Sequence, residues 1–284
     1  MPSLIAVGDN TVDVYLDQNL EYPGGNALNV AVFAARLGAA SAYLGCVGDD
    51  DHGRRLLDCL ALEGVDASHA RALPGATGWA CVSHEHGERV FLGSHPGVCR
   101  QLRLTESDLA CIAAFPLAHS SLYSGMETQL AAIRQASGCL AFDFSDNWAE
   151  FDWAALMPHV DIAFFSAAAL SLEAALALAH SMRALGPSTV VVTRGAQGAI
   201  AVDAHGAHEQ AGLPCNLVDS MGAGDGFIAA FLLALQSGRS LAQCLLQGAE
   251  FAAQVCGWHG GFGHGQAVTA TRAQQLKQAL NLQG

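Results

Sequence analysis

Residues 219–225 read Asp-Ser-Met-Gly-Ala-Gly-Asp and run directly into an apolar stretch of helical length, residues 223–236. The Gly222–Gly224 turn presents successive backbone N–H groups at the start of this helix, which is an anion site that needs no side chain. Asp225 falls in the first helical turn, where a carboxylate either stabilises the helix dipole or acts as a general base beside a phosphate. The two glycines before it favour the second interpretation.

Other side chains that commonly hold phosphate are scarce in this chain. Its 284 residues include 13 Lys+Arg and 26 Asp+Glu, the formal net charge is −13, and Lys277 is the single lysine. A Walker A loop ends in Gly-Lys-Ser/Thr, so that loop is absent, and Schiff-base chemistry is disfavoured. The acidic balance argues against general binding to nucleic acid or to an anionic membrane. Phosphate must therefore be held by backbone N–H groups, arginine or metal.

The composition is that of a folded protein with a large core. Hydrophobic residues make up 51% of the chain and charged residues 14%, which excludes a disordered protein. The nine cysteines are odd in number and form no C-x-x-C pair, a usage typical of reduced thiols in a cytoplasmic protein. We see no secretory signal and no apolar run near the ~20 residues that a membrane span needs.

Apolar strands and helices alternate along most of the sequence. We expect one α/β domain over residues 1–284, with a mostly parallel sheet covered by helices on both faces. A small β excursion is expected from the segments near 9–24 and 75–96. The predicted strands are 4–8, 41–45, 120–123, 140–144, 162–165, 190–193 and 199–202, and the predicted helices are 26–37, 52–63, 105–114, 127–136, 171–185, 223–236, 241–255 and 271–280.

Polar residues follow the first predicted strand. Asp9 and Asp13 belong to the segment Gly-Asp-Asn-Thr-Val-Asp at residues 8–13. Ligands bind at the carboxyl ends of strands in open α/β sheets, so both side chains are candidates for binding substrate. Asp13 either accepts hydrogen bonds from vicinal sugar hydroxyls or is a solvated loop acid.

A glycine pair precedes the first predicted helix. Gly24 and Gly25 either form a simple turn before the helix or allow a polar ligand to approach the backbone closely. Asn29 lies one helical turn later and is suited to hydrogen bonds with hydroxyl groups.

Two glycine-containing loops late in the chain are candidates for binding a nucleotide. Residues 193–198, Thr-Arg-Gly-Ala-Gln-Gly, join two predicted strands and form either a plain turn or a platform from which Arg194 reaches a phosphate. The second loop, residues 257–264, carries His259 and His264 five positions apart. Metal binding by these histidines is one interpretation, and loop packing against a ligand base is the other.

Taken together and in this order, these segments resemble the pfkB family of carbohydrate kinases, which includes ribokinase. Residues 219–225 are close to the C-terminal signature of that family, with Ser220 in place of its usual threonine. The resemblance implies a ribokinase-like fold with a small β lid, and ATP-dependent phosphorylation of a sugar or nucleoside hydroxyl. It assigns substrate binding to Asp9, Asp13, Gly24, Gly25 and Asn29.

The same resemblance implies a mechanism. Asp225 would accept the proton of the attacking hydroxyl, and the N–H groups of Gly222, Ala223 and Gly224 would stabilise the transferred phosphoryl group. Asp219, with nearby backbone carbonyls, would hold a monovalent cation such as K⁺. ATP with Mg²⁺ would lie over residues of the two late loops: Thr193, Arg194, Gly195, Gly198, Cys256 and His259.

Within the family, the chain more closely resembles the bacterial fructoselysine 6-kinases, at residues 8–13, 47–51, 142–146 and 221–225. Their substrate is a fructosamine with an amino-acid tail. Arg89 and His95 are candidate partners for the tail carboxylate, or else solvated lid residues. Alternatives are a kinase for ribose, fructose or adenosine, and a non-catalytic sensor on the same fold.

The sequence departs from the family pattern in two places. Many members carry Asn-x-x-Glu, associated with magnesium, where residues 166–169 here read Ser-Ala-Ala-Ala. The lid is also short, since only the nine residues 15–23 separate its first substrate segment from the glycine pair. The family resemblance allows a homodimer, but because the lid is short, dimerisation through the lid is not expected from the resemblance.

Overall fold

The structure is a computed structural model that describes residues 2–85, 88–148 and 152–281. Its centre is an eight-stranded sheet in the order β14-β13-β12-β11-β10-β9-β1-β4. The bounds of these strands are β1 Ser3–Val7, β4 Ala40–Leu44, β9 Ala118–Ser121, β10 Leu140–Asp143, β11 Ile162–Ser166, β12 Thr189–Thr193, β13 Ala199–Asp203 and β14 Gly206–Gln210.

Six of these strands run parallel, and β13 and β14 add two antiparallel strands at one edge. Parallel strands such as β1 and β12 are buried on both faces, which explains why their sequences are mostly apolar rather than alternating. The mostly parallel sheet expected from the sequence is therefore confirmed. The carboxyl ends of β1, β9, β10, β11 and β12 meet at one edge of the sheet.

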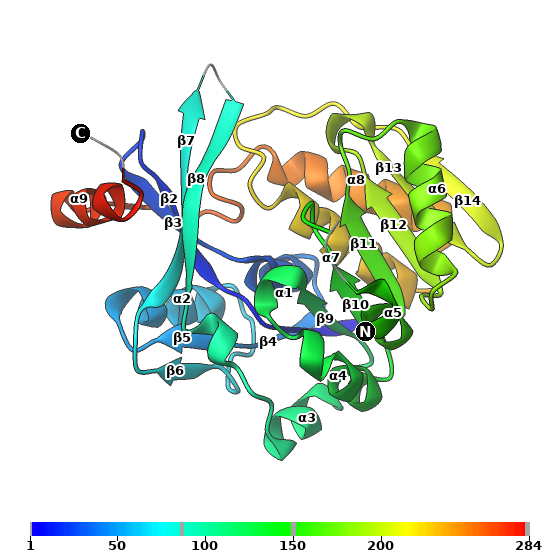
Figure 1. The fold of residues 1–284 in the computed structure, drawn as a ribbon, viewed down its shortest axis with the longest axis horizontal. Helices are drawn as coiled ribbons and strands as arrows, with labels where there is room; N and C mark the ends of the chain where they lie inside the picture. The colour runs from blue at the N-terminus through cyan, green and yellow to red at the C-terminus, as the bar shows by residue number, and fades with distance from the viewer. Residues whose placement is uncertain (1, 86–87, 149–151, 282–284) are drawn as a thin grey trace.

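Helices cover both faces of this sheet (Figure 1). One face carries α1 Asn26–Arg36, α2 Asp51–Leu62, α7 Ala223–Gln236 and α8 Leu241–Val255. The other carries α3 Glu106–Ile112, α4 Leu130–Ser137, α5 Trp153–Leu156 and α6 Leu172–Arg183. Local signals fix several helix starts: Asp50 caps α2, and Thr105 and Ser240 form capping boxes on α3 and α8.

A second, five-stranded sheet, called here the small sheet, stands beside the main one in the order β15-β3-β2-β7-β8. Its strands are β2 Thr11–Tyr15, β3 Leu20–Gly24, β7 Thr77–Glu85, β8 Glu88–Gly97 and β15 Gln266–Ala267, and a short pair, β5 Cys46–Gly48 with β6 Arg71–Leu73, lies at its base.

Each face of the small sheet has a distinct lining. Val12, Val14 and Cys81 form the outer face, and α9, Ala270–Ala279, packs on it through Leu276. Tyr15, Tyr22 and Val82 lie on the inner face together with Asp13, because side chains alternate along each strand. The part of the C-terminal segment that the structure describes thus packs with the small sheet, an arrangement not predicted from the sequence. Within the described residues, no helix is both long and apolar enough to cross a membrane.

Candidate active site

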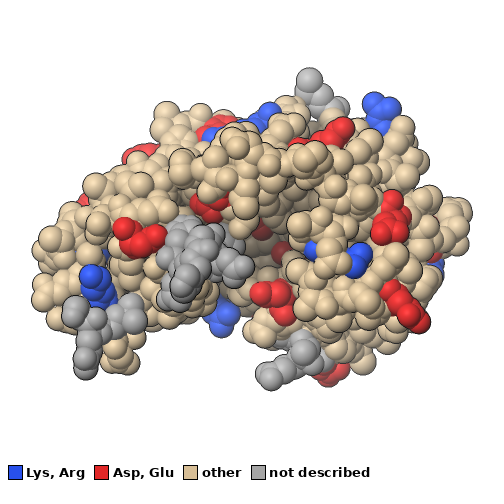
Figure 2. Space-filling view, turned by 90° about the horizontal axis from the view of Figure 1, so that it is seen from above, with Lys and Arg blue, Asp and Glu red and all other residues tan. Residues whose placement is uncertain are grey.

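The candidate site lies where the carboxyl ends of the parallel strands meet the first turns of α1 and α7. The inner face of the small sheet stands over this region (Figure 1). Figure 2 looks into the hollow between the two parts of the molecule, and acidic side chains are visible inside it. This is the position at which open α/β sheets bind ligands.

Asp225, at the start of α7, is held by two asparagine side chains from α1. Asn26 donates from Nδ2 to Oδ1 of Asp225 at 2.7 Å, and Asn29 donates from Nδ2 to Oδ2, also at 2.7 Å. Burial raises the pKa of Asp225 well above its ordinary value; the Asn29 amide opposes this rise, and the nearby carboxylate of Asp143 adds to it. A carboxylate with a raised pKa and a fixed orientation is suited to accepting a proton near neutral pH.

Asn26 also reaches a second carboxylate. Its Nδ2 donates to Oδ2 of Asp143 at 2.8 Å, while its Oδ1 faces Nε2 of His119 at 2.8 Å. Burial raises the pKa of Asp143 to about 7 and lowers the pKa of His119 to about 3. His119 is therefore neutral in the physiological range. Neither Asn26 nor His119 was predicted as a site residue, because a lone asparagine at a helix start and a lone histidine carry no spacing signal.

One polar atom beside Asp225 lacks a partner within the described structure. Oδ1 of Asn29 is buried and accepts no hydrogen bond. Gly261 lies close by, since a Cβ built on it would stand 3.8 Å from the Asn29 amide. Buried acceptors are nearly always satisfied in folded proteins, so this atom is suited to accept a ligand hydroxyl.

The turn before Asp225 has the form expected from the sequence. Gly222 is the N-cap of α7 in the left-handed conformation, with φ 73°, and no side chain caps the helix. A Cβ built on Gly224 would meet nothing within 4 Å. The chain thus leaves room for an anion beside Gly224, while the N–H of Ala223, the first residue of α7, donates to the backbone oxygen of Ser220 at 3.3 Å.

Asp13 and the glycine pair are brought together with this cluster. Asp13 is 4% exposed in β2, so it is a buried strand residue and not the solvated loop acid that the alternative interpretation offered. A Cβ on Gly24 would lie 2.1 Å from Oδ2 of Asp13, and one on Gly25 would lie 2.5 Å from Cα of Asn10. Glycine is required at both positions by close approach of the chain to itself.

The geometry does not support Asp9 as a substrate ligand. Its carboxylate accepts hydrogen bonds from the backbone N–H groups of Asn26 and Ala27 and from the hydroxyls of Ser121 and Ser124. Because both oxygens are used and the residue is 6% exposed, Asp9 acts as a cap for α1 supplied by a distant part of the chain.

The proposed nucleotide loop is present, but Arg194 does not extend from it. Thr193 ends β12, and a 3₁₀ turn over Gly195–Gln197 leads through Gly198 into β13. Arg194 is 7% exposed and donates to the backbone oxygen of Leu170 and to the side chain of Gln197. Its guanidinium therefore braces the loop from a buried position.

Three residues expected at the nucleotide base and cation positions lie beside the start of α7. Asp219 accepts hydrogen bonds from Tyr15 Oη and from the N–H groups of Met221 and Gly260, which ties the small sheet to the turn before α7. Cys256 ends α8, and its backbone oxygen accepts from the N–H of Asp219 at 3.1 Å. His259 is exposed and lines a cavity of about 560 Å³ with Tyr22 and Trp258.

His95 and Arg89 were the two residues expected to contact the carboxylate of the substrate's amino-acid tail. His95 stacks on Trp79, with ring centroids 6.4 Å apart, on the outer face of the small sheet. The strand alternation thus places His95 on the opposite face from Asp13, which argues against His95 as a substrate ligand. The side chain of Arg89, on β8, lies outside the part of the molecule that the structure describes.

In the described ranges, no three His, Cys, Asp or Glu side chains are placed to hold an ion. Asp219 accepts hydrogen bonds from three donors, and its expected role in holding a monovalent cation stays a prediction. Ser166, at the end of β11, and Ala167 begin the segment that departs from the Asn-x-x-Glu pattern of the family.

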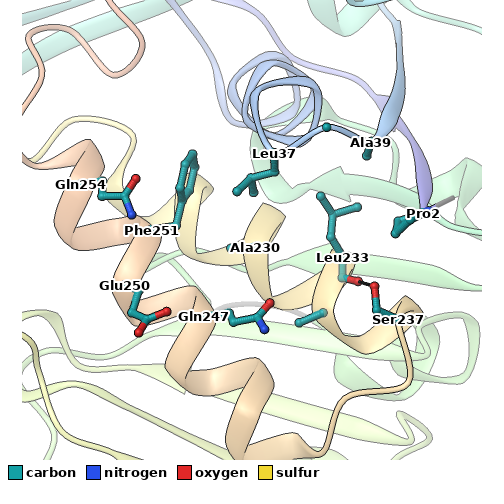
Figure 3. A pocket seen from close by; sticks show the side chains of 12 residues that line it. Pro2, Leu37, Ala39, Ala230, Leu233, Ser237, Gln247, Glu250, Phe251 and Gln254 are labelled. Carbon is teal, nitrogen blue, oxygen red and sulfur yellow. Dashed lines mark hydrogen bonds between the residues drawn. The ribbon is translucent and has the colours of Figure 1, made fainter.

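A further cavity, of about 290 Å³, lies away from this site (Figure 3). It is lined by Leu37 after the end of α1, by the later turns of α7 at Ala230 and Leu233, and by Phe251 of α8. Asp225 is at the opposite end of α7, so this cavity is separate from the carboxylate cluster.

Comparison with known proteins agrees with the geometry of the site. The family described as pfkB family carbohydrate kinase matches residues 3–262. The chain belongs to the pfkB family of carbohydrate kinases. It is therefore an ATP-dependent carbohydrate kinase, as the sequence signature predicted.

Two curated relatives and one solved structure illustrate the relationship. The fructosamine kinase FrlD of Bacillus subtilis is 42% identical over 92% of this chain and 93% of that protein. The fructoselysine 6-kinase of Escherichia coli is 38% identical over 92% of this chain and 99% of that protein. Arabidopsis thaliana ribokinase, solved with ribose and ATP, shares the fold with a TM-score of 0.80 at 22% identity, over 92% of this chain and 94% of that chain.

Proposed function

We propose that this kinase of the pfkB family phosphorylates a hydroxyl group, at the 6-position, of fructoselysine or a related fructosamine. Two relatives named for fructosamine and fructoselysine match nearly the whole chain at 42% and 38% identity. The observation that carries the chemistry is Asp225, which is fixed by Asn26 and Asn29 directly after an uncapped helix N-terminus.

In the proposed reaction, Asp225 accepts the proton of the attacking hydroxyl as its oxygen forms a bond to the γ-phosphorus. The bond from that phosphorus to the bridging oxygen of ATP breaks, and ADP leaves. The N–H groups of Gly222, Ala223 and Gly224 would stabilise the charge on the phosphoryl oxygens. Mg²⁺ accompanying ATP would offset the charge of the triphosphate.

The sugar is held in the proposed complex by Asp13 and Asn29. Asp13 is a buried carboxylate on the inner face of the small sheet, and Oδ1 of Asn29 is a buried acceptor without a partner in the described structure. Each is suited to a hydroxyl donor. The nucleotide would lie over Thr193, Gly195 and Gly198, with its base near Cys256 and His259.

The amino-acid tail is proposed to run along the inner face of the small sheet toward its hairpin. Phe91 pairs with Val82 on that face and is 63% exposed. An exposed aromatic ring there suits the methylene chain of a lysine adduct. Arg89, two positions earlier on the same strand, remains the candidate partner for the tail carboxylate.

The deciding experiment is a screen for ADP release with MgATP and a panel of acceptors. Fructoselysine, other fructosamines, fructose, ribose and adenosine would each be tested with the wild-type enzyme and with Asp225→Asn as the background control. We expect kcat/KM for fructoselysine to exceed that for fructose by a large factor, because remote contacts lower the barrier at the reacting hydroxyl. Equal values for fructose, or a preference for ribose or adenosine, would refute the substrate assignment. Ligand binding without ADP release would indicate a sensor.

A further inference from the structure

His119 and Asn26 form a chain of hydrogen bonds whose direction is fixed. His119 is 0% exposed on β9, and its Nε2 lies 2.8 Å from Oδ1 of Asn26. The Asn26 Nδ2 faces two carboxylates, so its Oδ1 must face the histidine, and Nε2 must carry the hydrogen. The chain therefore runs from His119 through Asn26 to Asp143 and Asp225.

Asn26 has almost no freedom apart from a flip of its amide. Its backbone N–H donates to Asp9 at 2.7 Å, and it lies at the first position of α1. A flipped amide would direct Oδ1 at Asp143 and Asp225, and an oxygen there can be accommodated only if one carboxyl carries a proton. The hydrogen on His119 Nε2 opposes this flip, because it would then face the amide NH₂.

We propose that His119 and Asn26 are positioning residues that keep Asp225 ionised and able to accept a proton. His119 acts through Asn26, and Asn26 acts through its hydrogen bonds to the two carboxylates. This inference rests on the proposed role of Asp225 as the base and extends it to two residues that stabilise its ionised state. Without the N–H donor on His119, the Asn26 amide can adopt both orientations. The flipped orientation, which needs a proton on Asp143 or Asp225, then becomes more populated.

The test compares the pH profiles of kcat/KM for wild type, His119→Leu and His119→Gln, using whichever acceptor the wild-type enzyme phosphorylates. Glutamine places an amide N–H near the position of Nε2, so it serves as the rescue variant. Ser120→Ala is the matched control, because Ser120 is the next residue of β9, is buried and makes no hydrogen bond through its hydroxyl in the described structure.

We expect the acid limb of the His119→Leu profile to move upward by about 1 pH unit. This corresponds to a roughly tenfold loss of kcat/KM on that limb, with recovery at high pH. His119→Gln should restore the wild-type limb, Ser120→Ala should leave it unchanged, and KM for ATP should change little. A loss of equal size at every pH, or a glutamine variant no better than leucine, would overturn the proposal.

Two additional measurements separate this inference from the kinase assignment. The carboxyl ¹³C resonance of Asp225 can be titrated in labelled wild type and in His119→Leu without any turnover, and its midpoint should rise in the variant. If His119→Leu does not fold, Asn26→Ala must show the same upward movement, since it removes the donor itself. An unchanged midpoint in the variant that folds refutes the proposal even if the enzyme is an active kinase.

Discussion

At the scale of single residues, Asp225 combines two properties that are usually opposed. Burial disfavours its charge, whereas two amide donors orient the charged form. We predict that Asp225→Asn lowers kcat by roughly 10²–10⁴-fold, the usual contribution of a general base. Because the pKa of Asp225 is higher in the folded than in the unfolded state, its ionisation lowers the free energy of unfolding as pH rises. Asparagine does not ionise, so the variant should unfold at an equal or higher temperature than wild type at pH 8. Near-native turnover would remove Asp225 from the mechanism.

Gly224 permits a separate test of the anion site. The space beside it is open in the structure, so a side chain there meets no protein atom but would occupy the proposed position of the phosphoryl group. We predict that Gly224→Val abolishes phosphoryl transfer while calorimetry still detects sugar binding, and that Gly224→Ala has an intermediate rate. Intact turnover in Gly224→Val would place the phosphoryl group elsewhere.

At the scale of helices and strands, a buried ionic cluster joins the small sheet to α2 and α9. Glu21 on β3 accepts from Arg272 at 2.8 Å and Gln266 at 2.6 Å, and lies 3.0 Å from His52. Although burial opposes it, hydrogen bonding to His52 and Gln266 and the charge of Arg272 lower the pKa of Glu21 to about 2. This stabilisation is present above the ordinary value of 4.5 and is lost as pH falls from there toward 2.

We therefore predict that Glu21→Gln lowers the free energy of unfolding by about 3 kcal/mol at pH 7, as expected when one partner of a buried ion pair is removed. The difference from wild type should shrink at pH 3. Urea unfolding at both pH values measures it, with the exposed Glu209→Gln as control. A difference that is the same at pH 3 and pH 7 would show that the charge of Glu21 is not the cause.

The elements differ in how well the sequence predicted them, for physical reasons. Helices α7 and α8 begin and end where expected, because Gly222 and Ser240 mark their starts and their cores are apolar. Strand β9 was expected at 120–123 but spans Ala118–Ser121. Its buried residues include His119, which hydrogen-bonds Asn26, and Ser121, which hydrogen-bonds Asp9. The strand is therefore polar and shows no apolar run in the sequence.

The candidate site shows the same division. Asp225 and the glycine turn were predictable from contiguous residues. The contact of Asn26 with His119 spans 93 positions, and the contact of Glu21 with Arg272 spans 251. Only the folded chain brings these pairs together, and the alternation of the small sheet, which removes His95 from the site, depends on a register set by the same long-range pairing.

At the scale of the whole molecule, the chain supplies its own cover for the outer face of the small sheet. Leu276 of α9 is 4% exposed against Val12, Val14 and Cys81, and Leu280 packs beside it. An apolar sheet face left open favours association with another chain, and here the helix already occupies that face. We therefore predict that the wild-type protein has the mass of one chain, 29.4 kDa, in light scattering after gel filtration.

The double variant Leu276→Asp/Leu280→Asp should uncover this sheet face, so we expect it to associate in a concentration-dependent way and to unfold at a lower temperature. The control Lys277→Asp, on the same helix, should show none of these changes. A wild-type dimer whose mass the double variant does not change would show that self-association uses another surface.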